Sequence, residues 1–368
     1  MSHEIKSIAF YLPQFHPIPE NDEWWGKGFT EWTNTAKAKP LFQGHYQPHV
    51  PADFGFYDLR CPETRSAQAC LAKEHGIFGF CYYHYWFGGH RVLERPFDEV
   101  LTSGEPDFPF CLCWANQTWT GIWHGAPNKI LIEQTYPGEA DYTAHFKTLL
   151  PAFRDHRYIT IDDKPIFVIY RPTEIPDGLY FTELWRDLAT KAGLTGLYLI
   201  GVSHDDSWLP EQNGFDASIL QKLPPSKISK VPWRHPLTKL RTLLAGKKLT
   251  IYNYAEVMNT FLRKEDALHR EFPCVLPNWD NTPRSGLNGM AIKNCHPELF
   301  RSVFRQAIGK VKKMPTNEKL LFIKSWNEWA EGNHLEPDQK NGRAFLEVVK
   351  EELDRTTDQD TRPKINKT

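Results

Sequence analysis

Two glutamates near the end of the chain, Glu328 and Glu331, are the residues best suited to chemistry. They come shortly after the apolar run 320–323, which predicts a buried parallel strand. In a continued strand the two side chains would point to opposite faces, but in a turn or a first helical turn their spacing brings the Cβ atoms within ~5–6 Å of each other. Because cleavage of a glycosidic bond uses two carboxyl groups, this pair on an aromatic-rich loop favours glycoside chemistry.

An alternative interpretation of the pair is purely structural. Glu-x-x-Glu is common at exposed helix starts, where acidic side chains interact favourably with the helix dipole. Here, however, Trp326 and Trp329 alternate with the glutamates, and an exposed helix start seldom needs two indoles. Because sugar rings stack their C–H faces on such rings, the surroundings favour the catalytic interpretation.

Tryptophan is the compositional outlier, with 13 copies, and most of these lie at the ends of predicted strands or in loops. Several of these tryptophans are explained by large rings that cover the ends of the hydrophobic core. Polar side chains with several donors and acceptors stand among these rings, which suits the hydroxyl groups of a sugar. We therefore predict that substrate is bound by His16, Glu31, Trp32, His84, Trp86, Trp114, Asn116, Tyr170, Trp279, Asp280, Arg284, Trp326 and Asn327. For His16 and His84 taken singly the alternative is core packing, and for Asp280 it is an Asx turn.

Apolar, β-rich segments alternate with helical patterns along the chain. The predicted strands are 8–12, 77–83, 108–114, 166–170, 197–202, 217–220, 274–276 and 320–324. The predicted helices are 62–75, 96–101, 140–153, 179–192, 255–268 and 297–312. Pro62 and Pro297 suit first helical turns, and Gly193 and Gly309 suit helix ends. Strands that alternate with helices predict a parallel sheet.

Eight such units predict an α/β protein with a closed (β/α)₈ TIM barrel and long βα loops, and an open doubly wound sheet is the alternative. The barrel is favoured because functional-looking residues follow many different strands and no Gly-x-Gly-x-x-Gly opens the first helix. The connections 13–60 and 221–254 are long, as expected of loops that build a site. We predict one catalytic domain over residues 1–354 and a disordered tail over 355–368.

Composition argues against several classes of function. The 44 Lys and Arg residues balance the 45 Asp and Glu residues, so net charge favours no nucleic-acid partner. Neither a secretory leader nor a run of 18 apolar residues is apparent, so a cytoplasmic protein is expected. The seven cysteines are scattered along the chain, which predicts reduced thiols in the core. Cys111 and Cys113 would lie on the same face of a strand, but no further cysteine or histidine nearby completes a set of four metal ligands. We expect no cofactor and no metal.

A basic stretch stands out between residues 217 and 255, where no acidic residue occurs. Its positive charges are Lys222, Lys227, Lys230, Arg234, Lys239, Arg241, Lys247 and Lys248. A solvated insertion is one interpretation. The other is a loop that attracts an anionic glycan or an anionic membrane surface, so residues 222–248 are a candidate for peripheral membrane contact.

Four segments carry a resemblance to a known family. They are Tyr11-Leu12-Pro13-Gln14-Phe15-His16-Pro17, Gly28-Phe29-Thr30-Glu31-Trp32, Trp279-Asp280-Asn281-Thr282-Pro283-Arg284 and 325–337. Together they resemble the glycoside hydrolase family 99-like group, in particular its WbsX-type polysaccharide-biosynthesis branch, from Ile8 to Asp338. The Trp-Asn-Glu-Trp-x-Glu-Gly motif is the specific part. The resemblance implies a (β/α)₈ barrel with a metal-independent, retaining mechanism on mannose-type glycans.

The resemblance also implies roles for the glutamate pair. The first glutamate, Glu328 here, would act as a base on the sugar's own 2-hydroxyl group and give a 1,2-anhydro sugar, while Glu331 would serve as general acid and then as base. Bacterial hydrolases of that family are typically exported, whereas WbsX-type members are associated with lipopolysaccharide O-antigen or capsule assembly and are often described as glycosyltransferases. We therefore expect cleavage or transfer of a glycosidic bond in surface-polysaccharide metabolism, on an oligosaccharide or a lipid-linked glycan. A nucleotide-sugar glycosyltransferase and a non-catalytic glycan-binding protein are the alternatives.

Overall fold

The structure is a computed structural model of the chain, and it describes residues 4–121, 126–204, 207–224, 249–264, 267 and 269–361. Eight parallel strands form its central sheet: β1 (Lys6–Tyr11), β2 (Ile77–His84), β5 (Phe110–Trp114), β9 (Lys164–Ile169), β10 (Tyr198–Ser203), β11 (Ala217–Leu220), β13 (Glu271–Val275) and β15 (Leu320–Ile323). Each strand pairs with the next in this order, and β15 pairs with β1, with Ile8 opposite Phe322. The sheet therefore closes into the predicted (β/α)₈ barrel, with all eight predicted strands in place, and the open sheet is excluded.

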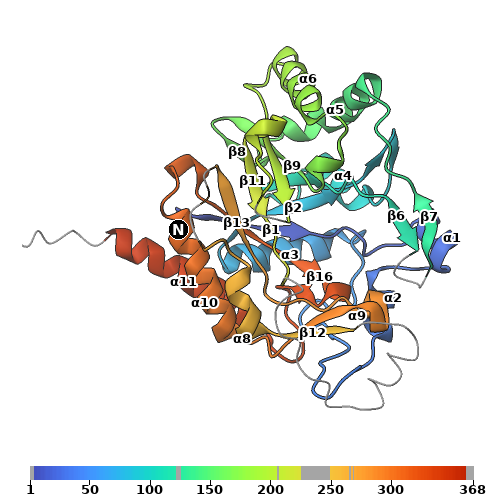
Figure 1. Cartoon of the computed structure of the whole chain (residues 1–368), viewed down its shortest axis with the longest axis vertical. Coiled ribbons are helices and arrows are strands. Elements are labelled where there is room, and N and C mark those ends of the chain that lie inside the picture. Colours follow the sequence, from blue (N-terminus) through green and yellow to red (C-terminus); the bar gives the residue numbers. More distant parts are fainter. Residues whose placement is uncertain are drawn as a thin grey trace, which may run out of the picture.

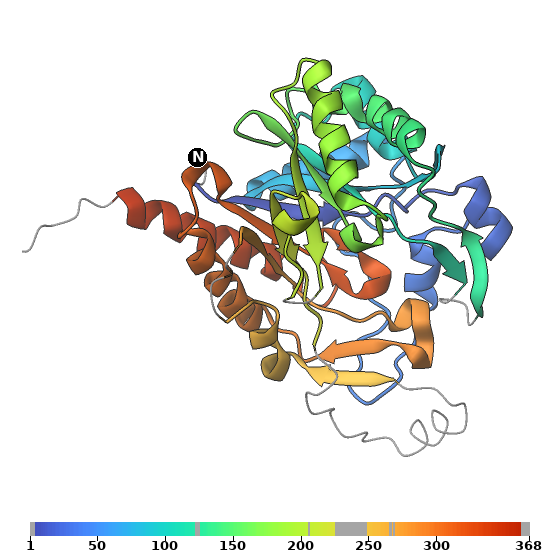
Figure 2. The same ribbon diagram turned by 45° about the horizontal axis from the view of Figure 1, so that its top comes forward.

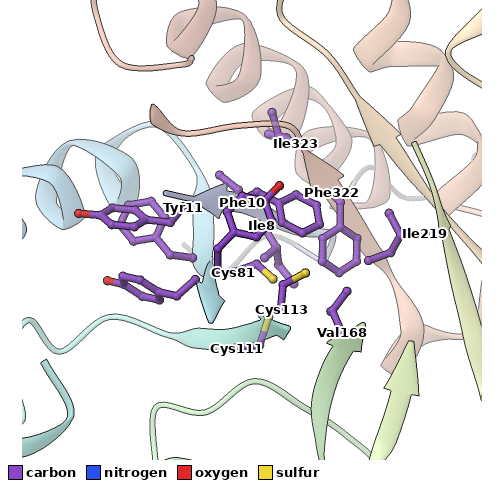
Figure 3. Close-up of a cluster of buried hydrophobic side chains, with 14 of the residues drawn as sticks. Ile8, Phe10, Tyr11, Cys81, Cys111, Cys113, Val168, Ile219, Phe322 and Ile323 are labelled. Atoms are coloured by element: carbon purple, nitrogen blue, oxygen red, sulfur yellow. The ribbon is translucent and has the colours of Figure 1, made fainter. Parts of the chain in front are cut away.

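The strands form because their apolar side chains are covered on both faces of the sheet. Every residue of β5, β10, β11 and β15 is buried, as expected of strands between a barrel interior and an outer layer of helices. Figure 3 shows Ile8, Cys113, Val168, Ile219 and Phe322, each from a different strand, gathered inside the barrel. Their packing is what holds the strand ends, and the loops that follow them, in fixed positions.

All seven cysteines carry free thiols, as predicted, but not all of them lie in the core. The thiols of β2, β5 and β13 are buried, whereas Cys61 and Cys70, at the start and in the middle of the first barrel helix, are exposed. The prediction of core positions is therefore wrong for these two residues.

Helices cover the outside of the barrel (Figures 1 and 2). They are α3 (Pro62–Glu74), α4 (Arg95–Ser103), α5 (Glu139–Phe153), α6 (Gly178–Lys191), α8 (Tyr254–Val257), α10 (Pro297–Val311) and α11 (Ala344–Thr361). Pro62 and Pro297 occupy first helical turns, where the missing N–H has no cost. Gly309, in contrast, lies inside α10 rather than at its end.

Two predicted segments differ from the structure. In place of one helix over 255–268, α8 ends at Val257 and a 3-10 turn follows, because the chain turns to bury Phe261 and to pair Arg263 with Glu271 at 2.8 Å. The predicted disordered tail is also wrong for residues 355–361, which continue α11. The ion pair of Arg355 with Glu352, at 2.8 Å, and the burial of Thr356 anchor the first residues of this segment. Residues 362–368 lie outside the described part of the chain.

Short elements decorate the loops. They are α1 (Pro19–Trp25), α2 (Glu31–Lys37), β3 (Trp86–Phe87), β4 (His90–Arg91), β6 (Trp119–Gly121), β7 (Ala126–Ile132), β8 (Thr160–Ile161), β12 (Thr250–Asn253), α9 (Thr282–Ser285), β14 (Met290–Lys293), β16 (Asn327–Glu328), the 3-10 turn η7 (Trp329–Glu331) and β17 (Asn333–His334). The β6–β7 hairpin lies beside α1 in both views (Figures 1 and 2). Among the helices that the structure describes, none combines the length and the apolar character needed to cross a bilayer. The basic stretch 222–248 falls outside the described residues from 225 onward.

Candidate active site

The glutamate pair lies on a short hairpin that follows β15. β16 carries Glu328 and pairs antiparallel with β17, and η7 between them carries Glu331. Gly332 closes this turn with φ of 58°. A Cβ atom at that glycine would stand 2.9 Å from the Cβ of Asp280, so both the positive φ and the close approach require glycine there.

Hydrogen bonds fix the hairpin to the barrel. The Asn327 amide pairs with both backbone groups of Leu12, just after β1, accepting from its N–H at 2.7 Å and donating to its carbonyl at 3.0 Å. The Ser325 hydroxyl accepts from the Glu328 N–H at 2.9 Å. The backbone N–H of Asp280 donates to the Glu331 carbonyl at 2.6 Å. The position of the pair is thus set by loops that follow three different strands, which is the usual construction of a site on this fold.

Both carboxylates open into one cavity of about 350 Å³. The cavity lies at the carboxyl ends of the strands, and its volume falls within the range of small-molecule sites. Aromatic side chains supply much of its wall: Trp25, Tyr83, Tyr85, Trp119, Tyr170 and Trp279. Polar side chains complete it: Gln14, Asn21, Gln117, Thr118, Thr120, Arg284 and Lys324.

Glu328 is held by a buried cation. The ammonium group of Lys324 lies 3.1 Å from its carboxylate, and the Asn333 side-chain amide donates to the same oxygen at 3.2 Å. The ammonium also lies over three rings at 5.6–5.7 Å: Tyr83, Tyr170 and Trp279. Burial favours the neutral amine and is the largest single effect, but the interactions with Glu328, Tyr170 and Glu331 together outweigh it and raise the pKa of Lys324.

Glu331 lies in a different environment. Burial raises its pKa to about 7, and repulsion from Glu328 adds to this effect, while Arg284 opposes it. The Arg284 guanidinium donates to Glu331 at 2.6 Å and to Glu31 at 2.6 Å, and Glu31 also accepts from the Ala330 N–H at 3.1 Å. The two carboxyl groups thus have different neighbours: Glu328 contacts the Lys324 ammonium, and Glu331 contacts the Arg284 guanidinium that it shares with Glu31.

Five of the predicted site residues line the cavity together: Tyr170, Trp279, Arg284, Glu328 and Glu331. Three others point to the opposite face of the sheet. His84 and Trp86 stack on His145 of α5, Trp86 also donates to Asp141 of α5, at 3.1 Å, and Trp114 contacts the same imidazole edge-on. Because neighbouring strand residues face opposite sides, side chains directed toward the helix layer cannot reach the barrel mouth. His84, Trp86 and Trp114, which were predicted to bind substrate, therefore do not face the cavity that holds the glutamate pair.

The remaining predicted residues lie in the scaffold behind the cavity wall: His16, Glu31, Trp32, Asn116, Asp280, Trp326 and Asn327. Asn116 bonds both backbone groups of Arg171, and the Trp32 indole donates to the Tyr57 carbonyl at 2.7 Å. Glu31 and Asp280 bond to the β16–β17 hairpin that carries the glutamate pair rather than face the cavity. The polar side chains in this group were predicted to bind substrate, but in the structure they form hydrogen bonds with other parts of the protein.

Sequence reasoning missed several residues of the cavity wall. Tyr83 and Tyr85 alternate with His84 and Trp86 along the second strand, so the period-two rule could have assigned them to the inner face. Lys324 directly precedes the motif, but a lysine at a strand end is normally exposed, and only the closed barrel buries it. Trp25 and Trp119 reach the cavity from α1 and the β6–β7 hairpin, which the sequence did not predict.

Comparisons with known proteins place this chain in a family. The family model described as glycosyltransferase WbsX matches residues 7–349. Curated relatives from two strains of Xanthomonas campestris pv. campestris, both described as uncharacterized protein WxcX, are 36% identical over 356 residues, or 95% of this chain. The chain spans 50% of the length of these relatives.

Solved structures share the fold at low sequence identity. One, described as a glycoside hydrolase-like protein, superposes with a TM-score of 0.61 and 16% identity, and the match covers 95% of this chain and 94% of the other. The GH99 endo-alpha-mannosidase from Bacteroides thetaiotaomicron gives a TM-score of 0.59 and 14% identity over 97% and 98% of the two chains. These likenesses establish the barrel architecture and leave the chemistry to the residues of the cavity.

Proposed function

Because this chain belongs to the WbsX family and has the barrel fold of GH99 endo-alpha-mannosidases, we propose that it is a carbohydrate-active enzyme of surface-polysaccharide metabolism. The reaction is cleavage or transfer of a glycosidic bond in an oligosaccharide or a lipid-linked glycan. The observation that carries the proposal is that Glu328 and Glu331 open into one aromatic-walled cavity with different environments.

The proposed chemistry divides between the two carboxyl groups. Glu328, whose carboxylate lies 3.1 Å from the Lys324 ammonium, removes the proton from the 2-hydroxyl group of the sugar, whose oxygen then attacks C1. Glu331, whose raised pKa keeps part of it protonated near neutral pH, gives its proton to the departing oxygen as the glycosidic bond breaks. A 1,2-anhydro sugar results. In the second step Glu331 takes a proton from the incoming hydroxyl compound, C1 is attacked, and Glu328 returns its proton to the 2-oxygen.

Of the two outcomes of this reaction, transfer to a sugar acceptor has a separate observation in its favour. The description of the matching family as a glycosyltransferase favours it. The same two carboxyl groups serve this reaction if a sugar hydroxyl replaces water in the second step. A non-catalytic glycan-binding protein would keep the aromatic walls but would not need a carboxylic acid with a raised pKa.

Ligand-dependent thermal stability tests the proposal and separates these candidates. Mannose oligomers and oligosaccharides linked to a lipid through a diphosphate are expected to raise Tm, since a ligand at a hundred times its Kd stabilises the folded protein by ~2.7 kcal/mol. Nucleotide diphospho-sugars alone are expected to give no shift. Product analysis with and without an added sugar acceptor then distinguishes hydrolysis from transfer. A response to nucleotide diphospho-sugars and to no glycan would overturn the glycosidase-like mechanism.

The raised pKa of Glu331 predicts the direction of the pH dependence. Turnover of substrates that need the acid should fall as the pH rises through about 7, because the proton of Glu331 is lost. Stability follows the same sign: the folded-state pKa lies above the unfolded value of ~4.3, so this contribution is present below ~4.3 and is lost as the pH rises through the folded value. A pH–rate profile of kcat/KM measures the falling limb.

Glu336 provides the control for this profile, because burial also raises its pKa to about 7. Its carboxylate lies outside the cavity and accepts hydrogen bonds from Trp329 at 2.6 Å and from Tyr57 at 2.8 Å. With a substrate whose departing oxygen needs a proton, the residual activity of Glu331→Gln should lack the falling limb, whereas Glu336→Gln should retain it. The reverse outcome would show that Glu331 is not the general acid.

A further inference from the structure

A second, smaller cavity of about 90 Å³ lies between the long connection that follows β1 and the loop after β17. His49, His334 and Asp338 line it, and all three are buried. One potential ligand atom from each lies within 4.8 Å of the other two. None of the three lines the cavity that holds Glu328 and Glu331.

Hydrogen bonds to neighbouring residues orient the side chains of the trio. Their potential metal-ligating atoms therefore point toward one another. Nδ1 of His334 lies 2.8 Å from the carbonyl oxygen of Glu336, and since a carbonyl only accepts, this nitrogen carries the ring proton. Its Nε2 therefore presents a lone pair, which faces Nδ1 of His49 at 2.8 Å. Asp338 places one oxygen 3.9 Å from the same Nε2, while its other oxygen accepts from the Asn341 N–H at 2.6 Å. Such outer hydrogen bonds are typical of residues that ligate metals.

Two imidazoles and one carboxylate form a ligand set suited to a late first-row divalent cation. Zinc is commonly bound by three protein ligands of these types with water as the fourth. Lys293 and Lys340 line the cavity together with the carboxylates of Asp280, Glu336 and Asp338, so charge alone does not select the ion, whereas two imidazole nitrogens in the trio favour zinc over Ca²⁺ or Mg²⁺. The cavity itself has room for the water ligand.

We propose that His49, His334 and Asp338 bind one divalent transition-metal ion, with Zn²⁺ as the best fit. Zn–N distances of about 2.0–2.1 Å place two tetrahedral nitrogens roughly 3.3 Å apart, so the two imidazoles separate by about half an ångström on binding. The ion replaces the hydrogen bond between the rings. The proton of His49 moves from Nδ1 to Nε2, and no net proton is released.

The ion would hold the β16–β17 hairpin, which carries the glutamate pair, against the connection that follows β1. His334 lies on β17, and its ring stacks on Trp329 at a centroid distance of 3.8 Å and an interplanar angle of 13°. Trp329 lies between Glu328 and Glu331, whereas His49 belongs to the connection after β1. Metal binding would therefore join the loop of the glutamate pair to a distant segment without contacting substrate. This role revises the expectation that the protein holds no metal, and it does not depend on the proposed reaction.

Metal titration of the full chain tests the inference. After removal of bound ions by a chelator, Zn²⁺ is added in competition with a chromophoric indicator, and Co²⁺ is added to observe its visible absorption. The expected result is saturation at about one ion per chain with a four-coordinate Co²⁺ spectrum, and a higher Tm with Zn²⁺ than with chelator. His49→Asn should weaken Zn²⁺ binding by more than about 100-fold, since even outer-shell changes cost 10–100-fold.

Two further variants keep the result interpretable. Asp338→Asn retains the oxygen that accepts from the backbone of Lys340 and Asn341 but loses the charge, so it should fold and still bind Zn²⁺ weakly. His75→Asn removes a buried imidazole outside the trio, whose Nδ1 contacts the Leu71 carbonyl at 2.8 Å, and it should bind Zn²⁺ like the parent protein. Absence of saturable binding in folded parent protein, or equal affinities in the parent, Asp338→Asn and His75→Asn proteins, would overturn the inference.

Discussion

Glu331→Gln should slow the reaction of glycosides with poor leaving groups by about 10²–10⁴-fold and affect activated aryl glycosides far less, because general acid assistance matters only when the departing oxygen needs a proton. Glu328→Gln should slow both kinds of substrate, since the base that activates the 2-hydroxyl group is needed whatever leaves. The measurement is kcat/KM over a series of aryl glycosides of decreasing leaving-group pKa. A steeper dependence in Glu331→Gln alone assigns the two roles.

Glu336→Gln is the matched control for this series. It removes the charge of a third buried glutamate on the same loop, but one that contacts Trp329 and Tyr57 instead of the cavity. Its dependence on the leaving group should equal that of the parent enzyme even if its stability falls. Wild-type turnover in both Glu328→Gln and Glu331→Gln, on a confirmed substrate, would refute the two-carboxylate mechanism.

Arg284→Met is expected to lower the free energy of unfolding by about 3–5 kcal/mol near pH 8, because it leaves carboxylates buried without their partner. The Arg284 side chain is 5% exposed and bridges Glu31 and Glu331 at 2.6 Å each. The loss should be smaller at pH 5, since protonation of both carboxyl groups removes the unpaired charges. Denaturant unfolding at the two pH values measures the difference.

Arg60→Met provides the comparison on the surface. Arg60 pairs with Asp58 at 2.7 Å, but its side chain is 42% exposed, so removing it should cost only about 0–1 kcal/mol. If Arg284→Met and Arg60→Met destabilise the protein equally at pH 8, the buried bridge does not hold the β16–β17 hairpin. A loss for Arg284→Met that does not shrink at low pH would show that packing, rather than charge, is responsible.

The barrel and the glutamate pair were predictable because each depends on local patterns. Strands buried on both faces are continuous apolar runs, and their alternation with helical segments leaves few possible topologies. The pair followed one such run, so its position at the end of a barrel strand required no knowledge of tertiary contacts. The prediction of a helix over 255–268 was wrong because a tertiary contact decided the structure there: burial of Phe261 overrode the helical pattern of the sequence.

The cavity wall was harder to predict because residue type was a poor guide to direction. His84 and Trp114 looked functional but face the helix layer, whereas Tyr83 looked like core and faces the mouth. Asn116 and Asn327 were chosen for their hydrogen-bonding capacity, which they use on the backbones of neighbouring loops. The orientation of a side chain at a strand end depends on strand register, and register is a tertiary property.

If the cavity binds glycans as proposed, the β6–β7 hairpin is the element through which glycan preference can change without altering the barrel. Trp119 and Thr120 of this hairpin form part of the cavity wall, and the Trp119 ring meets Tyr85 at 5.1 Å, edge to face. Yet the hairpin forms a separate two-stranded sheet outside the barrel ring. In the proposed function, insertions or substitutions there would change which glycans fit, while the hairpin that carries Glu328 and Glu331 keeps its strand pairing. Members of the family could thus diverge in polymer specificity by changing an appendage and leaving the catalytic framework untouched.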